Sequence, residues 1–196
     1  MLQQIKIKNK SLWVDLCERI NVCPKTFAIQ EIGNGYFAQA YALPNNKVLK
    51  VTNDKTDALG LRYFQKNPSE FIVKVHDIFK IEIEGADVFF VVVDKLRPLT
   101  NVWYSFLDEL SLQSGNVSLM IAKLKNASSA YNRKHKVKKK WLEDLHRYFS
   151  DRGFRILDFH EGNAMRKGRH QVQVIDLGLS FGYPKINISR LNENEF

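Results

Sequence analysis

The spacing of apolar residues changes once along this chain of 196 residues, and that change restricts the folds open to it. From residue 27 to residue 93, short apolar runs alternate with turns, which predicts five strands and one helix. Beyond Pro98 the apolar residues recur at helical spacing. We therefore expect an α+β protein with a five-stranded antiparallel sheet in its first part, a mostly helical second part, and a boundary near residues 94–100.

The same pattern bounds the expected elements. Strands are expected at 27–32, 40–43, 48–51, 71–83 and 88–93, the first three forming an antiparallel meander. Helices are expected at 12–20, with Ser11 as N-cap, and at 54–65, 101–113, 116–131 and 137–152. Short strands return within 155–183. The predicted organisation is a helical extension over 1–26, a first lobe over 27–96 and a second lobe over 97–196.

Composition limits the class of protein. Hydrophobic residues make up 44% of the chain and aromatic residues 12%, which is ample for a packed core. There is no run of about 18 apolar residues and no apolar leader after Met1, so we expect a cytoplasmic protein that does not enter a membrane. Cys17 and Cys23 lack CxxC spacing and a matching histidine cluster, so we interpret them as buried or free thiols.

Asp158, Asn163 and Asp176 are the residues that most directly suggest chemistry. The first two lie in the run Asp-Phe-His-Glu-Gly-Asn, and Asp176 follows a β-like run and precedes Leu-Gly. The first carboxylate can orient a hydroxyl nucleophile, while the amide oxygen and the second carboxylate can hold Mg²⁺ beside a nucleotide. Two unrelated polar turns are the alternative. His160, inside the run, either contacts a phosphate or braces the loop.

A glycine turn and a strand lysine in the first lobe suggest where phosphates bind. The run from Ile32 to Ala40 contains a GxGxxA turn between two strands, and Gly33 and Gly35 allow backbone N–H groups to approach phosphates. Lys50, in the third strand, can reach the same phosphates if it points inward. An ordinary glycine hairpin and a solvated lysine are the alternatives.

Together, in this order and spacing, these motifs resemble those of the protein-kinase-like superfamily over residues 27–182. The correspondence joins Gly33 and Gly35 to the glycine-rich loop, Val48-Leu-Lys50 to the strand-three lysine motif, Val93-Asp-Lys-Leu96 to the hinge, Asp158 and Asn163 to the catalytic-loop pair, and Asp176-Leu-Gly178 to the metal-binding triplet. The wording Asp-Phe-His-Glu-Gly-Asn is similar to the loops of aminoglycoside and choline kinase relatives and of compact phage or bacterial-effector kinases. The short stretch after Gly178 favours a minimal phage-encoded or bacterial-effector type kinase with a reduced second lobe.

The resemblance implies transfer of the γ-phosphoryl group of ATP, with Mg²⁺, to a serine or threonine hydroxyl of a partner or host protein, or of the chain itself. Asp158 is then the catalytic base, Lys50 binds phosphates, and Asn163 and Asp176 bind the metal. The other implied nucleotide contacts are Ile32, Gly33, Gly35, Ala38, Ala40 and Val48, with the backbone at Asp94 and Leu96. A phage or effector protein of this kind would act in the host cytoplasm.

The residues before the catalytic aspartate depart from the family. Ile156 and Leu157 stand where a histidine and an arginine are often found. Activation through a contact between a phosphate and that arginine is therefore not expected, and constitutive activity or activation by a partner is favoured.

The acid that pairs with the strand lysine is also unusual. No glutamate occurs between residues 51 and 69, so Asp57 is expected to pair with Lys50, with Asp54 as the alternative. Glu70 lies nearer the expected sequence distance, but it follows a proline at a strand entrance, and a structural or solvent-facing role is expected for it.

A net charge of +9 and the run from Arg133 to Lys140 suggest an acidic partner. This run is either a solvated surface or a docking patch for an acidic protein or nucleic acid, and without interleaved aromatic residues it does not support base recognition. Three functions therefore compete: a serine/threonine protein kinase, a small-molecule kinase, and a kinase-like binding module or inhibitor that acts through its basic surface.

Overall fold

The computed structural model describes residues 10–19, 30–34, 38–83, 85–112, 115–168 and 171–177. The chain divides into two compact units. The first comprises Met1–Lys55 and Val75–Lys95, and the second comprises Thr56–Lys74 and Leu96–Phe196. Each unit therefore draws on two stretches of sequence, and the helix expected at 54–65 groups with the second unit. The segment limits at residues 26 and 96 stay a prediction.

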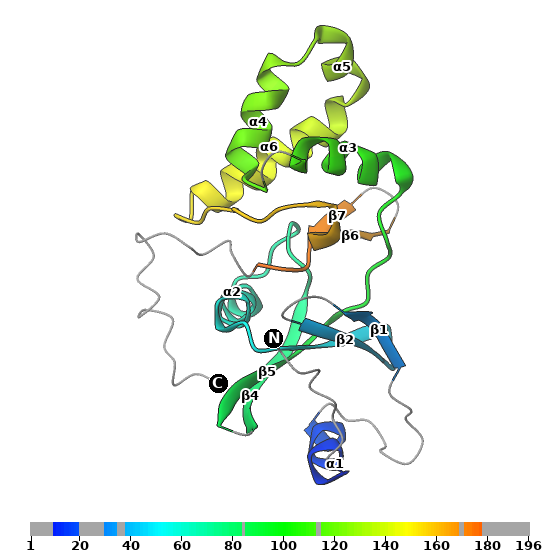
Figure 1. The fold of residues 1–196 in the computed structure, drawn as a ribbon, viewed down its shortest axis with the longest axis vertical. Helices are drawn as coiled ribbons and strands as arrows, with labels where there is room; N and C mark the ends of the chain where they lie inside the picture. Colours follow the sequence, from blue (N-terminus) through cyan, green and yellow to red (C-terminus); the bar gives the residue numbers. More distant parts are fainter. Residues whose placement is uncertain are drawn as a thin grey trace. The chain divides into compact units, whose positions relative to one another are not determined.

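The first unit is built on a five-stranded antiparallel sheet, as predicted (Figure 1). Its strands are β1 (Gln30–Asn34), β2 (Ala38–Leu43), β3 (Lys47–Thr52), β4 (Val75–Ile83) and β5 (Ala86–Asp94). The strand order is β1-β2-β3-β5-β4, and each neighbouring pair is antiparallel. The meander expected for the first three strands is confirmed, although residues 27–29 of the first predicted strand lie outside the described residues.

The turn between β2 and β3 explains how this hairpin closes. Asn45 and Asn46 have φ values of 58° and 57°, and Leu43 is the register partner of Lys47. Positive φ at both central residues is typical of the tight turns whose twist matches that of two antiparallel strands, and asparagine tolerates this conformation better than most residues. The two asparagines therefore set the register of β3 against β2.

One face of the sheet packs on the N-terminal helix α1 (Lys10–Arg19). Leu16 of α1 is fully buried in a cluster with Leu49, Val51, Phe79 and Phe90 of the sheet. The Phe79 and Phe90 rings, which are cross-strand partners, stack with their centroids 5.4 Å apart. Burial of side chains of this size contributes about 1.5–3 kcal/mol each, so α1 is part of the core of the first unit.

The cysteine nearest to this core behaves as expected. Cys17 is buried and is not in a disulfide. Cys23 lies outside the described residues. The interpretation of buried or free thiols is therefore confirmed at the first position only.

The second unit is mostly helical, again as predicted (Figure 1). Its elements are α2 (Lys55–Lys66), α3 (Asn101–Ser111), α4 (Val117–Asn126), α5 (Ser129–Lys134), α6 (Lys136–Ser150), the 3₁₀ turn η1 (Glu161–Asn163), β6 (Ala164–Lys167) and β7 (Gln171–Val174). A continuous helix over 116–131 was a wrong prediction. α4 ends at Asn126, because Ser128 caps a new helix by accepting a hydrogen bond from the Tyr131 N–H at 3.2 Å.

The strand predicted over 71–83 also begins later than expected, at Val75. Phe71 and Val73 instead make backbone hydrogen bonds to Val174 in the second unit, at 2.8 and 3.0 Å. The apolar run 71–83 therefore contributes to two sheets. Its first part pairs with β7 through a parallel bridge between Ile72 and Val174, and its second part forms β4.

Aromatic side chains form the core of the second unit. Phe64 of α2 lies 5.6 Å from Phe149 and 5.9 Å from Phe154 between ring centroids. Trp141 of α6 lies 5.4 Å from Trp103 and 6.0 Å from Phe159. The second set of contacts places the segment around residue 158 directly on α6.

Within the part of the chain that the structure describes, no helix has the length and apolar character needed to cross a membrane.

Candidate functional site

The short hairpin β6–β7 brings Asn163 and Asp176 to one place. Ala164 and Val174 are partners at the open end of this hairpin, so Asn163 and Ile175 are the residues that flank it. The Ile175 N–H donates a hydrogen bond to the Asn163 carbonyl at 3.0 Å, and Asp176 follows directly. The structure thus brings together the two residues predicted to bind the metal, one directly before β6 and the other two residues after β7.

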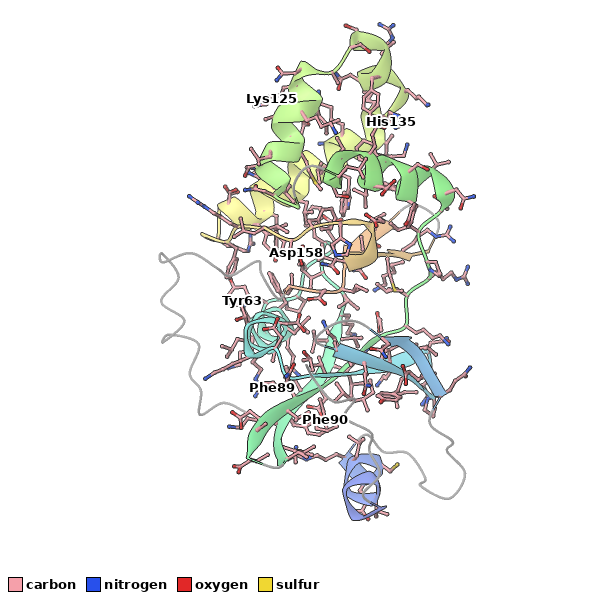
Figure 2. The ribbon with its side chains drawn as sticks, viewed as in Figure 1. Tyr63, Phe89, Phe90, Lys125, His135 and Asp158 are labelled. Atoms are coloured by element: carbon pink, nitrogen blue, oxygen red, sulfur yellow. The ribbon has the colours of Figure 1, made fainter. Side chains whose placement is uncertain are left out.

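Asp158 is tied to the same end of the hairpin by Asn163. The Asn163 side-chain amide donates to the Asp158 carbonyl oxygen at 2.8 Å, and the Asp158 side chain is exposed beside the hairpin (Figure 2). This bond uses the amide nitrogen, so the amide oxygen remains on the other side of the group. Asp158, Asn163 and Asp176 therefore belong to one hydrogen-bonded loop system.

His160 braces this loop. Its Nδ1 accepts a hydrogen bond from the Gly162 N–H at 3.0 Å, and its carbonyl accepts from the Asn163 N–H at 3.0 Å. Both bonds hold the 3₁₀ turn η1 that separates Asp158 from β6. Of the two roles expected for His160, the structure confirms bracing.

The loop rests on two residues that sequence reasoning missed. Phe159 is fully buried, and its N–H donates to the Gly115 carbonyl at 2.8 Å. A Cβ atom added at Gly115 would lie 2.9 Å from both the Asp158 Cα and the Phe159 nitrogen, which is closer than real Cβ atoms approach. Gly115 is therefore needed for the backbone contact that supports Asp158. No local signal in the sequence marks it, because the requirement comes from a distant segment.

Asp57 is attached to the segment that carries Asp176. It is 1% exposed, and its Oδ1 accepts a hydrogen bond from the Leu177 N–H at 3.0 Å. A buried carboxylate that accepts a backbone N–H fixes the position of that peptide. Asp57 thus positions the residue next to Asp176, while its predicted pairing with Lys50 stays a prediction, as does the alternative at Asp54.

In the first unit, the predicted nucleotide residues of β2 and β3 share one face of the sheet. Ala40 is the register partner of Lys50, and Val48 and Ala38 lie two residues away on the same face because side chains alternate along a strand. This is the face opposite to Leu49 and its partners, which pack on α1. The three small or branched apolar residues and the lysine therefore share one face of this sheet, while their contact with a nucleotide stays a prediction.

The glycine turn is described only in part. Gly33 is the partner of Ala40, and a Cβ atom at Gly33 would lie 3.6 Å from the Ala40 Cβ, an ordinary contact. Ile32 lies where the register between β1 and β2 shifts, and it is 43% exposed. Gly35, like Gly178 of the second unit, falls outside the described residues.

The backbone around Leu96 has a distinctive hydrogen-bond pattern. The Lys95 N–H donates to the Asn46 carbonyl at 2.8 Å, and Arg97 exchanges bonds of 3.0 and 2.8 Å with Arg166. Between them, Leu96 has no backbone hydrogen bond to any residue that the structure describes. The contact of the Leu96 backbone with a nucleotide, expected for a hinge residue, stays a prediction.

Asp94, at the end of β5, uses its side chain within the sheet. Its Oδ1 lies 2.6 Å from His76 Nε2 on β4, and both side chains are about one quarter exposed. The side chain of Asp94 therefore bonds to the sheet, so the predicted contact with a nucleotide falls to its backbone.

The donor set at the hairpin end suits magnesium. Asn163 and Asp176 offer amide and carboxylate oxygens, which are ligands that Mg²⁺ prefers. Among residues 10–19, 30–34, 38–83, 85–112, 115–168 and 171–177, no group of three or more His, Cys, Asp and Glu could hold a metal. A site with one or two protein ligands is nevertheless typical of Mg²⁺ that is bound together with nucleotide phosphates.

Comparisons with known proteins give structural likenesses only. No protein-family model matches the sequence, and no curated protein matches it. One solved structure that it resembles is a thermostable mutant of aminoglycoside phosphotransferase APH(4)-Ia in its apo form, with 13% identity, a TM-score of 0.33, and coverage of 58% of this chain and 38% of that one. Another is Rad53 1-466 in complex with AMP-PNP, with 16% identity, a TM-score of 0.44, and coverage of 86% and 43%. The chain spans less than half of either structure, and likenesses at TM-scores below 0.5 do not by themselves assign a fold.

Proposed function

We propose that this protein transfers the γ-phosphoryl group of ATP to a hydroxyl group in a reaction that requires Mg²⁺. The observation that carries the proposal is the hydrogen-bonded loop system that joins Asp158, Asn163 and Asp176. Phosphoryl transfer needs positioning and charge stabilisation more than covalent chemistry, and this set supplies a base and two oxygen ligands in one place.

The residues of the second unit have distinct roles in the proposed reaction. Asp158 orients the acceptor hydroxyl and takes its proton, an effect typically worth about 10²–10⁴-fold in rate. Asn163 and Asp176 hold the Mg²⁺ through oxygen atoms, and the metal would neutralise charge on the phosphates. Asp57 keeps the backbone beside Asp176 in place through Leu177.

The first unit supplies the proposed nucleotide contacts. The apolar face formed by Ala38, Ala40 and Val48 suits the adenine ring, and Lys50 on the same face suits the phosphates. The open backbone groups of Leu96 and the carbonyl of Asp94 suit the edge of the base. Ile32, Gly33 and Gly35 are assigned to the loop over the phosphates.

We further propose that the acceptor is a serine or threonine of a partner or host protein, as in a minimal kinase of the phage-encoded or bacterial-effector type. The exposed position of Asp158 supports a macromolecular acceptor, since its carboxylate is reachable without enclosing a small substrate. The chain itself is a second acceptor of the same class. The cytoplasm is the proposed compartment.

Two measurements test this proposal. Mg-ATP should raise the melting temperature, because a ligand at about 100 times its Kd adds about 2.7 kcal/mol to stability. Radiolabelled ATP should then transfer phosphate to proteins of a lysate, and Asp158→Asn should abolish this transfer while the thermal shift remains. Absence of both the shift and the transfer rejects the proposal; transfer only to small molecules rejects the protein acceptor.

A further inference from the structure

Four cations gather where α5 meets α6, and we call Arg133, Lys134, Lys136 and Lys139 the basic corner. The first three side chains are exposed and the fourth is half-buried. Within the parts of the chain that are described, none of the four is paired with a carboxylate. The basic corner is therefore a group of cations without an ion-paired acid among the described residues.

Glu109 and Asp144, two carboxylates of the same unit, have other partners. Glu109 accepts a hydrogen bond from the Tyr131 hydroxyl at 3.0 Å, and burial together with this bond raises the pKa of Tyr131 to about 12. Asp144 lies 3.1 Å from Lys140 and 3.7 Å from Arg147. Within the described residues neither of these acids is ion-paired with the basic corner, and neither is Glu143, which lies four residues after Lys139 on α6.

A buried histidine holds the corner in shape. His135, labelled in Figure 2, is 7% exposed. Its ring lies 5.2 Å from that of Phe106 and 4.5 Å from that of Tyr131. The Lys138 Nζ lies 3.0 Å from His135 Nδ1 and 5.5 Å from the Phe106 ring centroid. Lys138 therefore packs against His135 and Phe106 of its own unit. It is not counted as part of the basic corner for this reason.

The like charges raise the local positive potential. Burial, followed by the charge of Lys134, lowers the pKa of Lys138. Burial, followed by Lys138 and Lys134, lowers the pKa of His135. Repulsion of this kind is unfavourable in the isolated protein and is relieved when an anionic partner binds.

Val137 distinguishes between classes of anionic partner. This side chain lies within the basic run and is 74% exposed. The run from 133 to 140 contains no aromatic residue on which a nucleic-acid base could stack. Val137 lies between Lys136 and Lys138 in the sequence, and an exposed apolar residue beside an exposed lysine matches a peptide in which acidic residues flank an apolar one.

We propose that the basic corner binds an acidic segment of a partner protein, with carboxylates on Arg133, Lys134 and Lys136 and an apolar side chain over Val137. This inference goes beyond the proposed phosphoryl transfer and is independent of it. Binding is expected without nucleotide.

The test uses the full chain and a fluorescent peptide, Glu-Asp-Glu-Leu-Asp-Glu-Asp, with anisotropy as the readout. Lys134→Glu with Lys136→Glu should weaken binding about tenfold or more, since charge pairs are replaced by repulsion. The matched control is Lys74→Glu with Lys95→Glu, which makes the same change in net charge at exposed positions elsewhere and should leave Kd unchanged within about twofold. If the corner variant does not fold, the milder Lys134→Gln with Lys136→Gln serves the same purpose.

Val137→Ser tests the apolar contact. It should reduce binding of the leucine peptide to the level of a peptide with serine in place of leucine, and it should leave binding of the serine peptide unchanged. A DNA oligonucleotide of equal charge should bind more weakly than the leucine peptide. The proposal is overturned if the leucine peptide does not bind, if the control variant loses as much affinity as the corner variant, or if DNA binds as tightly and Val137→Ser changes nothing.

Discussion

The Asn163 amide donates a hydrogen bond to the Asp158 carbonyl at 2.8 Å, so the nitrogen of this side chain closes the loop, while its oxygen is the atom proposed to bind the metal. These two duties can be separated by substitution. Asn163→Asp keeps an oxygen ligand but loses the N–H donor, whereas Asn163→Ala loses both.

We expect Asn163→Asp to lower the free energy of unfolding by about 0.5–1.5 kcal/mol, the usual net value of one hydrogen bond. It should retain the thermal shift with Mg-ATP but transfer phosphate more slowly, because Asp158 is less well held. Asn163→Ala should lose the Mg²⁺-dependent part of that shift as well. Wild-type transfer by the aspartate variant would show that the bond to Asp158 does not matter for positioning.

Asp57 offers a second prediction, which concerns stability. Asp57→Ala leaves the Leu177 N–H buried without its acceptor, and we expect a loss of about 1–3 kcal/mol in urea unfolding. Asp57→Asn keeps an oxygen at the same place and should lose less. If the alanine and asparagine variants are equally stable, the bond to Leu177 is not what holds this segment.

Gly115 offers a third prediction. Gly115→Ala brings a Cβ atom to 2.9 Å from the Asp158 Cα and the Phe159 nitrogen, and backbone cannot yield as a flexible side chain does. Overpacking of this kind typically costs about 1–3 kcal/mol, and phosphate transfer should fall because the loop moves. Gly33→Ala is the control for stability alone, since its Cβ would meet only the Ala40 Cβ at 3.6 Å.

A pH dependence follows from His135. Burial, then Lys138 and Lys134, lower the pKa of His135 below its usual value of 6.5, while Glu109 acts in the opposite direction. The unfolded chain therefore binds a proton at higher pH than the folded protein does. The contribution of neutral His135 to stability is complete above pH 6.5, and it is lost as the pH falls from there through the folded-state pKa.

Comparison with His135→Phe isolates this effect, because phenylalanine keeps the stacked ring and removes the proton. The difference in unfolding free energy between the two proteins, measured by urea at several pH values, should be constant above pH 6.5. Below pH 6.5, the wild type should become less stable relative to the His135→Phe variant. A difference that is flat from pH 7 to pH 5 would contradict the assignment.

The sequence predicted those features that depend on local pattern. Alternation along residues 38–52 placed Ala40, Val48 and Lys50 on one face, because the side chains of a strand alternate whatever surrounds it. Asp158, Asn163 and Asp176 were found because their residue types and order are themselves the signal.

The features that were missed depend on contacts between distant segments. Gly115 is required only because the backbone of Asp158 and Phe159 lies against it. Phe71 and Val73 looked like the start of a strand, but Val174 captures their hydrogen bonds. One missed feature differs, because its cause is local. The Ser128 cap divides α4 from α5, and the helical spacing of the apolar residues across 116–131 does not reveal this division.

The bond between Asp57 and Leu177 also has a consequence for how the chain is assembled during synthesis. Its two residues are 120 positions apart, and the strands β4 and β5 of the other unit are made between them. When α2 leaves the ribosome, Leu177, whose N–H donates to the Asp57 carboxylate in the folded protein, has not yet been synthesised. This bond therefore forms only after Leu177 has emerged, and until then the Asp57 carboxylate lacks the backbone partner that it has in the folded unit.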